Sequence, residues 1–214
     1  MIEPGPAKDT YRWIAKGYDT VVAPLNRPIW QIAMKMCPPG PDDEVLDVGC
    51  GTGTALVEFQ RAGYATSGID LSAAMLARAK GRLGDSADLR VGDATALPYE
   101  DSSVDLVTAA FLIHELPPPV RPAVVAEMLR VTKPGGRTMV IDHAPGPFHG
   151  MKGRLSGMLI STLEFVTGRE HFRNFRQFEK AGGVPGLVES AGLAITEDKL
   201  LNGGTIGLYV LAAR

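Results

Sequence analysis

The segment 45–53 constrains this chain more than any other, because an apolar run there ends in a turn with alternate glycines. The run predicts a buried strand with Asp47 near its end, and glycines let the backbone bend sharply and approach a ligand closely. The three turn glycines are Gly49, Gly51 and Gly53. A second predicted strand ends at Asp70, about 20 residues further on, where a carboxylate suits the ribose hydroxyls of a nucleoside. The sequence therefore predicts a nucleoside-binding site at the ends of two strands.

Composition excludes several other classes of protein. The chain has 214 residues, enough for one domain with a large core, and its formal net charge of −2 gives no field that attracts nucleic acid. Its two cysteines, Cys37 and Cys50, have no metal-ligand spacing, so we expect a reducing compartment, no disulfide and no metal site. The first residues lack the basic start and apolar core of a signal peptide, and the apolar segment 155–163 is far shorter than the roughly 20 residues that span a bilayer. We therefore expect a cytoplasmic protein.

Short β-rich runs alternate with helical patterns along most of the chain. We predict strands at residues 44–48, 65–70, 89–92, 104–110 and 137–142, and helices at 7–23, 54–61, 72–83 and 120–131. Such alternation predicts an α/β fold with a parallel sheet and helices on both faces. The ligand crevice of such a sheet lies beyond the carboxyl ends of its strands. Residues 193–199 and 205–212 predict a final strand pair around the turn at 202–204.

The segment 145–183 differs from the rest, because it holds five of the seven phenylalanines and more basic than acidic residues. We predict that it is an insertion packed over the strand ends. A helix there would place three rings on one side and two arginines on the other. These residues are Phe172, Phe175 and Phe178, with Arg173 and Arg176 between them. The rings either dock on the core or line an acceptor pocket with a basic rim, which would suit a lipid head group at a membrane surface.

The spacing of the turn glycines distinguishes between nucleoside ligands. A dinucleotide fingerprint is G-x-G-x-x-G, but here Thr54 stands where the third glycine would be. A phosphate-binding P-loop would need a lysine, and none lies in this turn. Asp47 instead places a negative charge near the ligand, which suits a cation and repels a phosphate.

With these motifs the chain resembles the class I S-adenosylmethionine-dependent methyltransferases over roughly residues 40–142. The matching motifs are Asp47-Val48-Gly49-Cys50-Gly51-Thr52-Gly53, Gly68-Ile69-Asp70-Leu71-Ser72, Gly92-Asp93-Ala94, the run from Asp105-Leu106-Val107 to His114-Glu115-Leu116, and residues 129–136. The resemblance implies a Rossmann-like, doubly wound, mostly parallel seven-stranded sheet with an antiparallel last strand and a helical insertion over the strand tips. It also implies one domain over 1–214. Its parts would be an N-terminal helical lid (1–40), a cofactor-binding core (41–144), an acceptor cap (145–183), and a terminal helix with a strand pair (184–214).

The resemblance also implies S-adenosylmethionine as the cofactor, with a set of binding residues. Asp70 would take both ribose hydroxyls, and Asp93 would accept a hydrogen bond from the adenine amino group. Met75 would pack on the adenine, with core packing as the alternative, and Tyr18 would lie either on a lid over the cofactor or on a helix surface. The implied cofactor-binding residues are Tyr18, Asp47, Gly49, Gly51, Gly53, Asp70, Leu71, Met75, Asp93, Ala94, Ala110 and Phe111.

A narrower resemblance concerns the acceptor. Tyr18-Asp19 and residues 130–136 are similar to the ubiquinone/menaquinone C-methyltransferases and their phospholipid N-methyltransferase relatives. The chain departs from that group near Asp142 and Ala144, where the group has a Glu and a Ser, and in a shorter interval from Tyr18 to Trp30. The subgroup implies a small-molecule or lipid acceptor and leaves open which acceptor and which atom is methylated.

Methyl transfer mainly requires an acceptor aligned with the activated methyl group, and it needs a general base only where the acceptor must lose a proton. His114 follows the fourth strand, where the acceptor should approach, so it is the candidate catalytic residue, with a structural role as the alternative. Candidate acceptor residues are His143, His171, Arg173 and Arg176. The sequence leaves open a non-catalytic S-adenosylmethionine-binding protein, an NAD-dependent oxidoreductase, peripheral membrane contact and the oligomeric state. It argues against a nucleic-acid acceptor, because it has no added basic domain, and it leaves a polypeptide acceptor open.

Overall fold

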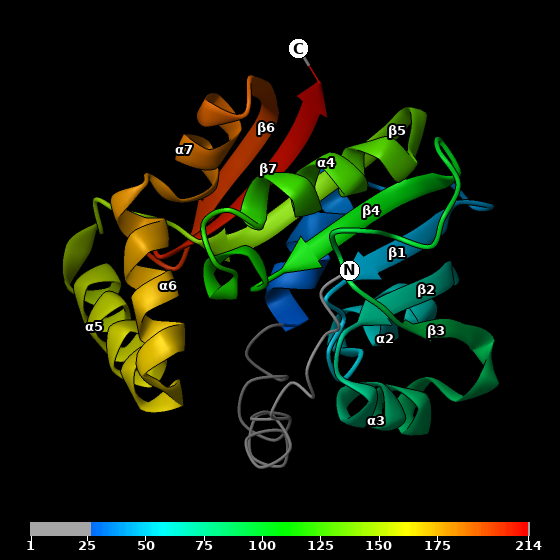
Figure 1. The fold of residues 1–214 in the computed structure, drawn as a ribbon, viewed down its shortest axis with the longest axis horizontal. Coiled ribbons are helices and arrows are strands. Elements are labelled where there is room, and N and C mark those ends of the chain that lie inside the picture. Colours follow the sequence, from blue (N-terminus) through cyan, green and yellow to red (C-terminus); the bar gives the residue numbers. More distant parts are fainter. Residues whose placement is uncertain (1–26, 214) are drawn as a thin grey trace.

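Seven strands form one sheet in the spatial order β3-β2-β1-β4-β5-β7-β6 (Figure 1). The strands are β1 (Glu44–Val48), β2 (Ala65–Asp70), β3 (Ala87–Val91), β4 (Val104–Ala110), β5 (Thr132–His143), β6 (Leu193–Leu201) and β7 (Ile206–Ala213). The structure is a computed structural model, and it describes residues 27–213. Neighbouring strands pair in parallel from β3 across to β5, and β7 is antiparallel to both β5 and β6. The predicted doubly wound sheet with an antiparallel last strand is confirmed.

The order of the chain reverses between β1 and β4, which are neighbours in the sheet although β2 and β3 lie between them in the sequence. After β1, the next two strands of the chain, β2 and β3, are added on one side of it in the sheet. After β4, the next strand, β5, is added on the opposite side. Connections that leave in opposite directions open a crevice at the carboxyl ends of the two strands. Asp47 pairs with Gly68 on β2 and with Thr108 on β4, so it lies at the head of this crevice.

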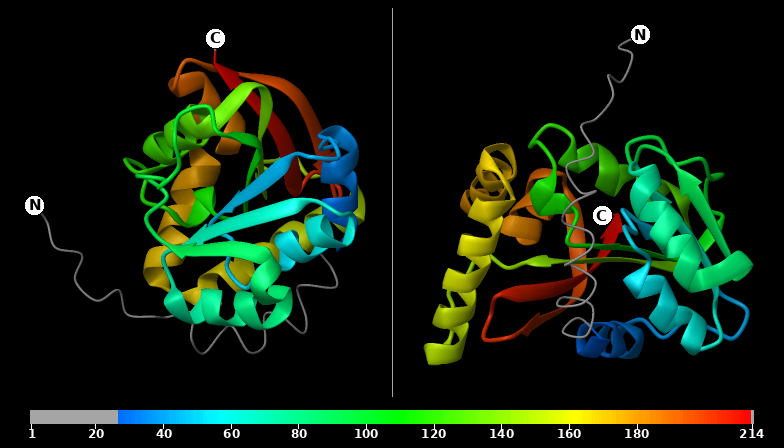
Figure 2. Two further views of the ribbon diagram at one scale, coloured as in Figure 1. Left: turned by 90° about the vertical axis from the view of Figure 1, so that its right-hand side faces the viewer. Right: turned by 90° about the horizontal axis from the view of Figure 1, so that it is seen from below.

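Helices cover both faces of the sheet (Figure 2). They are α2 (Thr54–Arg61), α3 (Ala73–Leu83), α4 (Arg121–Val131), α5 (Gly150–Thr167), α6 (Arg169–Lys180), α7 (Gly183–Ser190) and the short 3₁₀ helices η1 (Gly84–Ser86) and η2 (Ile113–Glu115). Residues 27–36 are also helical. Strand residues alternate between two cores: Leu106 packs in the same cluster as Phe59 of α2, whereas Val107 packs with Val124 of α4. This alternation is what a sheet buried on both faces requires.

Most predicted elements lie where the sequence placed them. Ser72 caps α3, because its Oγ accepts a hydrogen bond from the N–H of Met75. The strand predicted at 89–92 corresponds to β3, which runs from Ala87 to Val91. Gly92 therefore lies beyond the end of the strand. The helix predicted at 7–23 lies outside the described residues, as does most of the predicted lid.

The strand predicted at 137–142 is longer, because β5 begins at Thr132. Thr132 pairs with Val104 of β4, and the strand continues through Gly135 and Gly136. A β-carbon at Gly136 would lie 2.7 Å from the carbonyl oxygen of Asp105, so glycine lets the two strands approach here. Pairing with β4 therefore outweighs the local tendency of glycine to end a strand.

The helices α5 and α6 form a cap, defined here as residues 145–183, beside the ends of β4 and β5 (Figure 1). α5 turns two glycines inward: a β-carbon at Gly153 would lie 2.5 Å from the carbonyl oxygen of Gly203, and one at Gly157 would lie 2.5 Å from the ring of Phe148. On α6, Phe175 and Phe178 are buried, so these two rings dock on the core. Within residues 27–213, no helix combines the length and the apolar composition needed to cross a membrane.

Candidate active site

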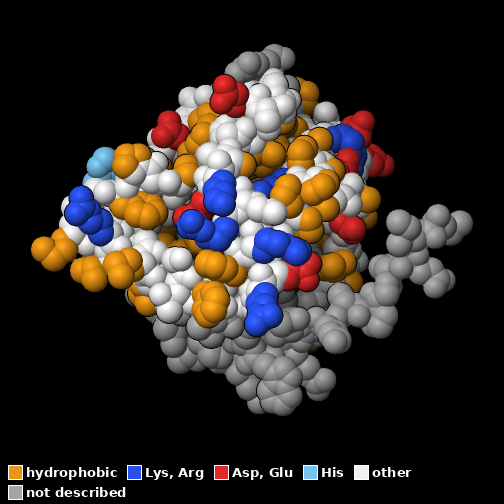
Figure 3. All heavy atoms as spheres, turned by 60° about the vertical axis from the view of Figure 1, so that its left-hand side comes forward, with side chains coloured by type: hydrophobic (Ala, Val, Ile, Leu, Met, Phe, Trp, Pro, Cys, Tyr) orange, Lys and Arg blue, Asp and Glu red, His pale blue; other side chains and the backbone are white. Residues whose placement is uncertain are grey.

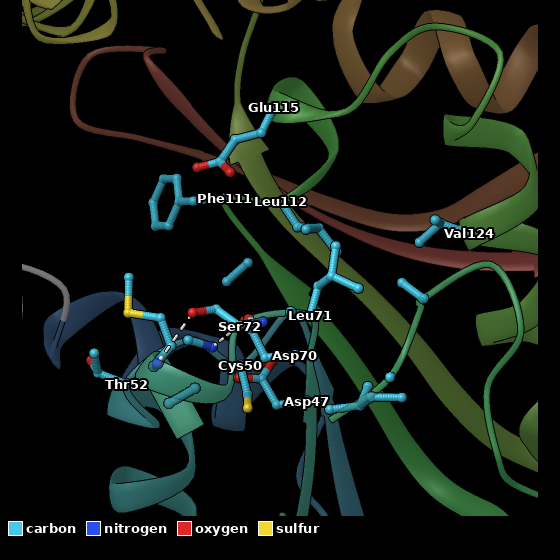
Figure 4. Close-up of a pocket in the computed structure, with 18 of the residues that line it drawn as sticks. Asp47, Cys50, Thr52, Asp70, Leu71, Ser72, Phe111, Leu112, Glu115 and Val124 are labelled. Atoms are coloured by element: carbon cyan, nitrogen blue, oxygen red, sulfur yellow. Dashed lines mark hydrogen bonds between the residues drawn. The ribbon is translucent and has the colours of Figure 1, made fainter. Parts of the chain in front are cut away.

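A cavity of about 600 Å³ opens at the carboxyl ends of β1, β2 and β4 (Figure 4). It lies where the order of the chain reverses, and its volume is typical of sites for cofactors and small molecules, which hold roughly 300–1,000 Å³. The predicted cofactor-binding residues all line it, with the exceptions of Gly53 and Tyr18. Those that line it are Asp47, Gly49, Gly51, Asp70, Leu71, Met75, Asp93, Ala94, Ala110 and Phe111. Tyr18 lies outside the described residues.

The three glycines of the turn after β1 have different surroundings. All have positive φ, at +71° for Gly49, +54° for Gly51 and +75° for Gly53, which is a conformation that favours glycine. A β-carbon at Gly49 would lie 2.9 Å from the side chain of Leu112, and one at Gly53 would lie 2.9 Å from Leu83 of α3. A β-carbon at Gly51 would meet no atom within 4 Å. Gly53 therefore serves packing against α3, and Gly51 leaves open space at the cavity.

Two backbone groups hold Asp70 at the tip of β2. Its Oδ2 accepts a hydrogen bond from the N–H of Gly51 at 2.8 Å, and its Oδ1 accepts one from the N–H of Ser72 at 2.8 Å. These two hydrogen bonds fix the orientation of the Asp70 side chain at the cavity. The first bond also ties the glycine turn to the neighbouring strand, which fixes the carboxylate relative to the open space at Gly51.

Asp47 is buried beneath the same turn, and the hydroxyl of Thr108 donates a hydrogen bond to its Oδ1 at 2.8 Å. Burial raises the pKa of Asp47 to about 7; the bond from Thr108 opposes this change and the negative charge of Asp70 adds to it. A nearby cation favours the ionised form of such a carboxyl group. The position therefore suits a positively charged ligand.

One side of the cavity suits a flat base. Leu71, which is 65% exposed, and Met75 line the cavity with apolar surface. Asp93 also lines the cavity, and its Oδ1 accepts hydrogen bonds from the N–H and the hydroxyl of Thr95, both at 2.8 Å. Apolar side chains next to a fixed acceptor can bind an aromatic ring that carries an amino group.

Phe111 and Glu115 lie together across the cavity from Asp47 (Figure 4). Phe111 directly follows β4 and has φ +53°, a conformation that bulky residues rarely adopt, and its N–H donates to the carbonyl oxygen of Ile141 at 2.8 Å. Glu115 and Trp30 also line the cavity, although neither was predicted from the sequence to do so. The position of Glu115 next to the candidate catalytic histidine could have identified it, whereas the interval from Tyr18 to Trp30 does not place Trp30 at the cavity.

His114, the predicted catalytic residue, is buried, and it is not among the residues that line the cavity. Its Nδ1 is 2.7 Å from Oδ1 of Asp142, and its backbone N–H donates to Oδ2 of Asp142 at 3.1 Å. Burial alone would lower the pKa of His114, but the charge of Asp142 and the hydrogen bond to it raise the pKa to about 9. This geometry favours the structural alternative for His114.

His143 and His171, predicted to contact the acceptor, lie beside His114 instead of in the cavity wall. Their ring centroids are 4.6 Å and 5.5 Å from that of His114. Glu164 of α5 approaches both, because its Oε1 is 3.5 Å from Nε2 of His143 and its Oε2 is hydrogen-bonded to Nε2 of His171. Burial would raise the pKa of Glu164, yet these two histidines hold it well below its usual range. Glu164 was not predicted from the sequence, because no local spacing links it to the histidines.

The prediction that Arg173 and Arg176 contact the acceptor is not supported by their positions. Both are exposed on α6 and form ion pairs along that helix, Arg173 with Glu170 at 3.6 Å and Arg176 with Glu179 at 2.7 Å. The helical period explains why the arginines are exposed. Phe175 and Phe178 face the core, so the arginines between the rings face solvent.

Taken together, the cavity fits S-adenosylmethionine. Asp70 suits the ribose hydroxyls, and the surface between Leu71 and Asp93 suits adenine. Asp47 suits a ligand with positive charge, and the open space at Gly51 gives that ligand room. A nicotinamide dinucleotide fits less well, because its pyrophosphate would lie near the carboxylate of Asp47.

Comparison with known proteins agrees with this assignment. A family model described as a methyltransferase domain matches residues 45–136. The chain is 32% identical over 178 residues to a demethylmenaquinone methyltransferase of Renibacterium salmoninarum, which covers 79% of this chain and 74% of that protein. It is 39% identical over 104 residues to a phosphatidylethanolamine N-methyltransferase of Cereibacter sphaeroides, which covers 46% of this chain and 50% of that protein. In fold, it is similar to an S-adenosylmethionine-dependent methyltransferase from Aquifex aeolicus, with a TM-score of 0.58, 19% identity and coverage of 85% and 88%.

The chain therefore belongs to the class I S-adenosylmethionine-dependent methyltransferases. It is an enzyme that uses S-adenosylmethionine as its methyl donor, as the motifs around Asp47 and Asp70 predicted. The family membership sets aside the oxidoreductase alternative and favours catalysis over ligand binding alone.

Proposed function

We propose that this methyltransferase methylates an apolar quinone or lipid that it takes from a membrane surface. The relatives named above are methyltransferases of demethylmenaquinone and of phosphatidylethanolamine, and both of these acceptors are amphipathic or apolar molecules. The observation that carries the proposal is the outer face of α5, which exposes large apolar side chains next to the cavity end of the sheet.

The exposed apolar residues of α5 form one stripe along the helix. They recur at positions i, i+4, i+7, i+8 and i+14, so they share one side of a 3.6-residue period. These residues are Met151 (79% exposed), Leu155 (61%), Met158 (70%), Leu159 (60%) and Phe165 (63%). The inward side of the same helix holds Gly153 and Gly157 against the rest of the protein. Because the glycines face inward, the large apolar side chains are left in solvent.

Basic residues flank this apolar stripe. Lys152 and Arg154 are exposed on either side of it, and further arginines follow on α6. Figure 3 shows apolar side chains beside Lys and Arg side chains on the face of the molecule that includes the cap. An apolar stripe with basic edges is the pattern of helices that lie in the interface of an anionic bilayer. We therefore propose that this face of α5 binds a lipid surface. The cap would then be the part of the chain through which the acceptor enters.

When bound, S-adenosylmethionine supplies a methyl carbon to which the acceptor atom bonds while the electron pair of the breaking bond passes to sulfur. The residues of the chain position the two reactants. Asp70 and Gly51 hold the nucleoside side of the cavity, and Phe111 forms the wall opposite. Holding reactants in line can contribute roughly 7–11 kcal/mol in favourable cases.

A methylated ring carbon or amine must also lose a proton, and Glu115 is the proposed proton acceptor. It lines the cavity and lies directly beside His114, which orients this short helical turn through its two bonds to Asp142. In this proposal His114 is a positioning residue. Glu115→Gln should lower kcat and leave the affinity for S-adenosylhomocysteine unchanged, whereas an unchanged kcat would remove Glu115 from the reaction.

The acceptor is tested by transfer of labelled methyl groups from S-adenosylmethionine in anionic phosphatidylglycerol vesicles. One sample carries demethylmenaquinol, a second carries phosphatidylethanolamine, and a third contains water-soluble phenols and amines without vesicles. The proposal expects transfer to one of the first two. Transfer to the soluble acceptors alone would overturn it.

Membrane contact is tested separately by sedimentation with the same vesicles. The double variant Leu155→Asp and Met158→Asp should lose at least about tenfold in vesicle binding, because burial of one such side chain contributes about 1.5–3 kcal/mol. Leu200→Asp is the matched control, since Leu200 is an exposed apolar residue on β6. If the double variant binds the vesicles as well as Leu200→Asp does, lipid contact is contradicted. It is also contradicted if the double substitution changes only the oligomeric state in gel filtration, from dimer to monomer.

A further inference from the structure

The helix α5 carries charge on its inward side and large apolar side chains on its outward side. Its single acidic residue is Glu164, whose side chain is only 13% exposed, whereas Met158 and Leu159 of the same helix are exposed. A carboxylate is costly to remove from water unless positive charge and hydrogen bonds compensate for the loss of hydration. The inward position of Glu164 therefore depends on its partners.

Three histidines from three other segments face this carboxylate. Its Oε2 is 3.7 Å from Nε2 of His114 on η2 and is hydrogen-bonded to Nε2 of His171 on α6. Its Oε1 is 3.5 Å from Nε2 of His143 at the end of β5. All three imidazoles are nearly buried, so little water competes with them for the carboxylate. These contacts join α5 to the end of the sheet.

The strength of these contacts depends on protons. Burial would raise the pKa of Glu164, but the hydrogen bonds from His143 and His171 hold it well below its usual range. Burial would lower the pKa of His114, but the charge of Asp142 and the hydrogen bond to it raise this pKa to about 9. Because such coupling is reciprocal, the carboxylate of Glu164 favours protonated imidazoles around it. The other titratable and charged groups that act on the cluster are Asp142 of β5, Glu115 of η2, Arg121 of α4 and Tyr209 of β7.

Glycines at both ends of α5 allow the helix to move relative to the sheet. Gly150 has φ +66° and Gly168 has φ +142°, and a β-carbon at either position would meet no atom within 4 Å. Residues at the ends of an element can absorb a change of backbone angles when that element moves. The first turns of α5 lie against the turn between β6 and β7, where Asn202 donates a hydrogen bond to Oγ of Ser156 at 2.6 Å. Glu164 lies near the opposite end of the helix, where it can hold or release that end.

We propose that Glu164 is a latch that docks α5 on the end of the sheet while the facing histidines carry protons, and that α5 is released when they lose them. Loss of the protons leaves a buried carboxylate without positive charge beside it, and movement of α5 returns this carboxylate to water. The latch also reaches the cavity wall, because the ring centroid of His143 is 5.5 Å from that of Phe111. Glu164 is thus a positioning residue for the acceptor side of the cavity, whichever acceptor is methylated.

The pH range of the latch follows from the directions of the two pKa changes. A histidine with a raised pKa stabilises the folded protein below its ordinary pKa of about 6.5, and this contribution is lost as the pH rises through the pKa in the folded protein, which is about 9 for His114. A glutamate with a lowered pKa stabilises the folded protein above its ordinary pKa of about 4.3, and this contribution is lost only at lower pH. The latch is therefore closed near pH 6.5 and released by about pH 10.

The first test is thermal unfolding of the full chain at pH 6.5 and at pH 10. Glu164→Gln should lower the unfolding temperature by roughly 5 °C at pH 6.5, because it removes a charge-assisted partner of the histidines. At pH 10 the difference should vanish or reverse, since the unmodified protein then holds an uncompensated buried charge. His171→Gln should show the same dependence on pH, and the two losses should add at pH 10 but not at pH 6.5. Glu170→Gln is the matched control, because Glu170 is an exposed acid of the same cap, 3.6 Å from Arg173; its small effect should be equal at both pH values.

Digestion with trypsin at pH 8 distinguishes release of α5 from loss of the whole fold. Arg154 on α5 and Arg169 at the start of α6 are exposed cleavage sites. Glu164→Gln should be cut there roughly tenfold faster than Glu170→Gln while it still binds S-adenosylhomocysteine. If Glu164→Gln does not fold, His171→Gln provides the same comparison. The proposal is overturned if the folded variants lose the same unfolding temperature at both pH values, because the contacts would then be packing that does not respond to protons. It is equally overturned if the cap of these variants is cut no faster than that of Glu170→Gln.

Discussion

The burial of Asp47 makes binding of the methyl donor depend on pH near neutrality. Its pKa lies at about 7 because burial, the largest cause, disfavours the carboxylate. A ligand with an ammonium group near this carboxylate favours the ionised form. Below pH 7 the ligand must therefore displace a proton before it gains that interaction, and above pH 7 it need not. Affinity is expected to fall as the pH falls.

The size of the effect follows from the pKa. About nine-tenths of Asp47 is ionised at pH 8 and about one-tenth at pH 6, so the affinity should fall about tenfold between them, or about 1.4 kcal/mol. Isothermal titration with S-adenosylhomocysteine, which keeps the ammonium group and cannot be turned over, measures this directly. Thr108→Val removes the hydroxyl that donates to Asp47 at 2.8 Å, so it should move the midpoint of the profile to higher pH.

The matched control is Asp47→Asn, which keeps the size of the side chain and removes the titration. Its affinity should be lower at pH 8 and nearly constant from pH 6 to pH 8. A flat profile in the unmodified protein, or the same slope in Asp47→Asn, would show that another group controls binding and would refute this account of Asp47.

Three further predictions concern the nucleoside side and the cap. Asp70→Ala should weaken binding of S-adenosylhomocysteine by about 1.5–3 kcal/mol through the loss of charge-assisted hydrogen bonds, and titration calorimetry that shows unchanged affinity would exclude Asp70 from the site. Gly53→Ala should destabilise the fold by about 1–3 kcal/mol in urea unfolding, because Gly53 packs against α3. Gly51→Ala should lower ligand affinity more than stability, because Gly51 has open space around it. A larger loss of stability for Gly51→Ala than for Gly53→Ala would contradict these assignments. Phe178→Ala should cost about 3–5 kcal/mol of stability, because this ring is 1% exposed, and a cost below about 1 kcal/mol would show that the cap does not dock there.

The part of the site that could be predicted from sequence is the part built from contiguous residues. The turn after β1 needs glycine for its positive φ, and a strand that ends in an acid places that acid at the crevice whatever the rest of the chain does. For this reason Asp47, Asp70 and Asp93 lie where the motifs placed them. Helix α2 has the predicted bounds, and Ser72 caps α3 as predicted, because both features also depend on neighbouring residues in the sequence.

Features that depend on distant contacts were not predictable in the same way. β5 extends back to Thr132 because β4 offers it a partner, which overrides the two glycines within the strand. The helix α5 faces inward with glycine and outward with leucine and methionine, so its hydrophobic pattern points away from the core instead of toward it. The cluster around Glu164 is assembled by four segments with no common spacing, and only the fold brings them together.

The backbone at Phe111 has a consequence for engineering. A phenylalanine held at φ +53° costs about 1–2 kcal/mol relative to a relaxed conformation, and glycine would not bear that cost. A library selected only for heat resistance should therefore enrich glycine at position 111, whereas a library selected for turnover should retain the aromatic ring that shapes the cavity wall. Thermal robustness and catalytic performance would then compete at a single codon.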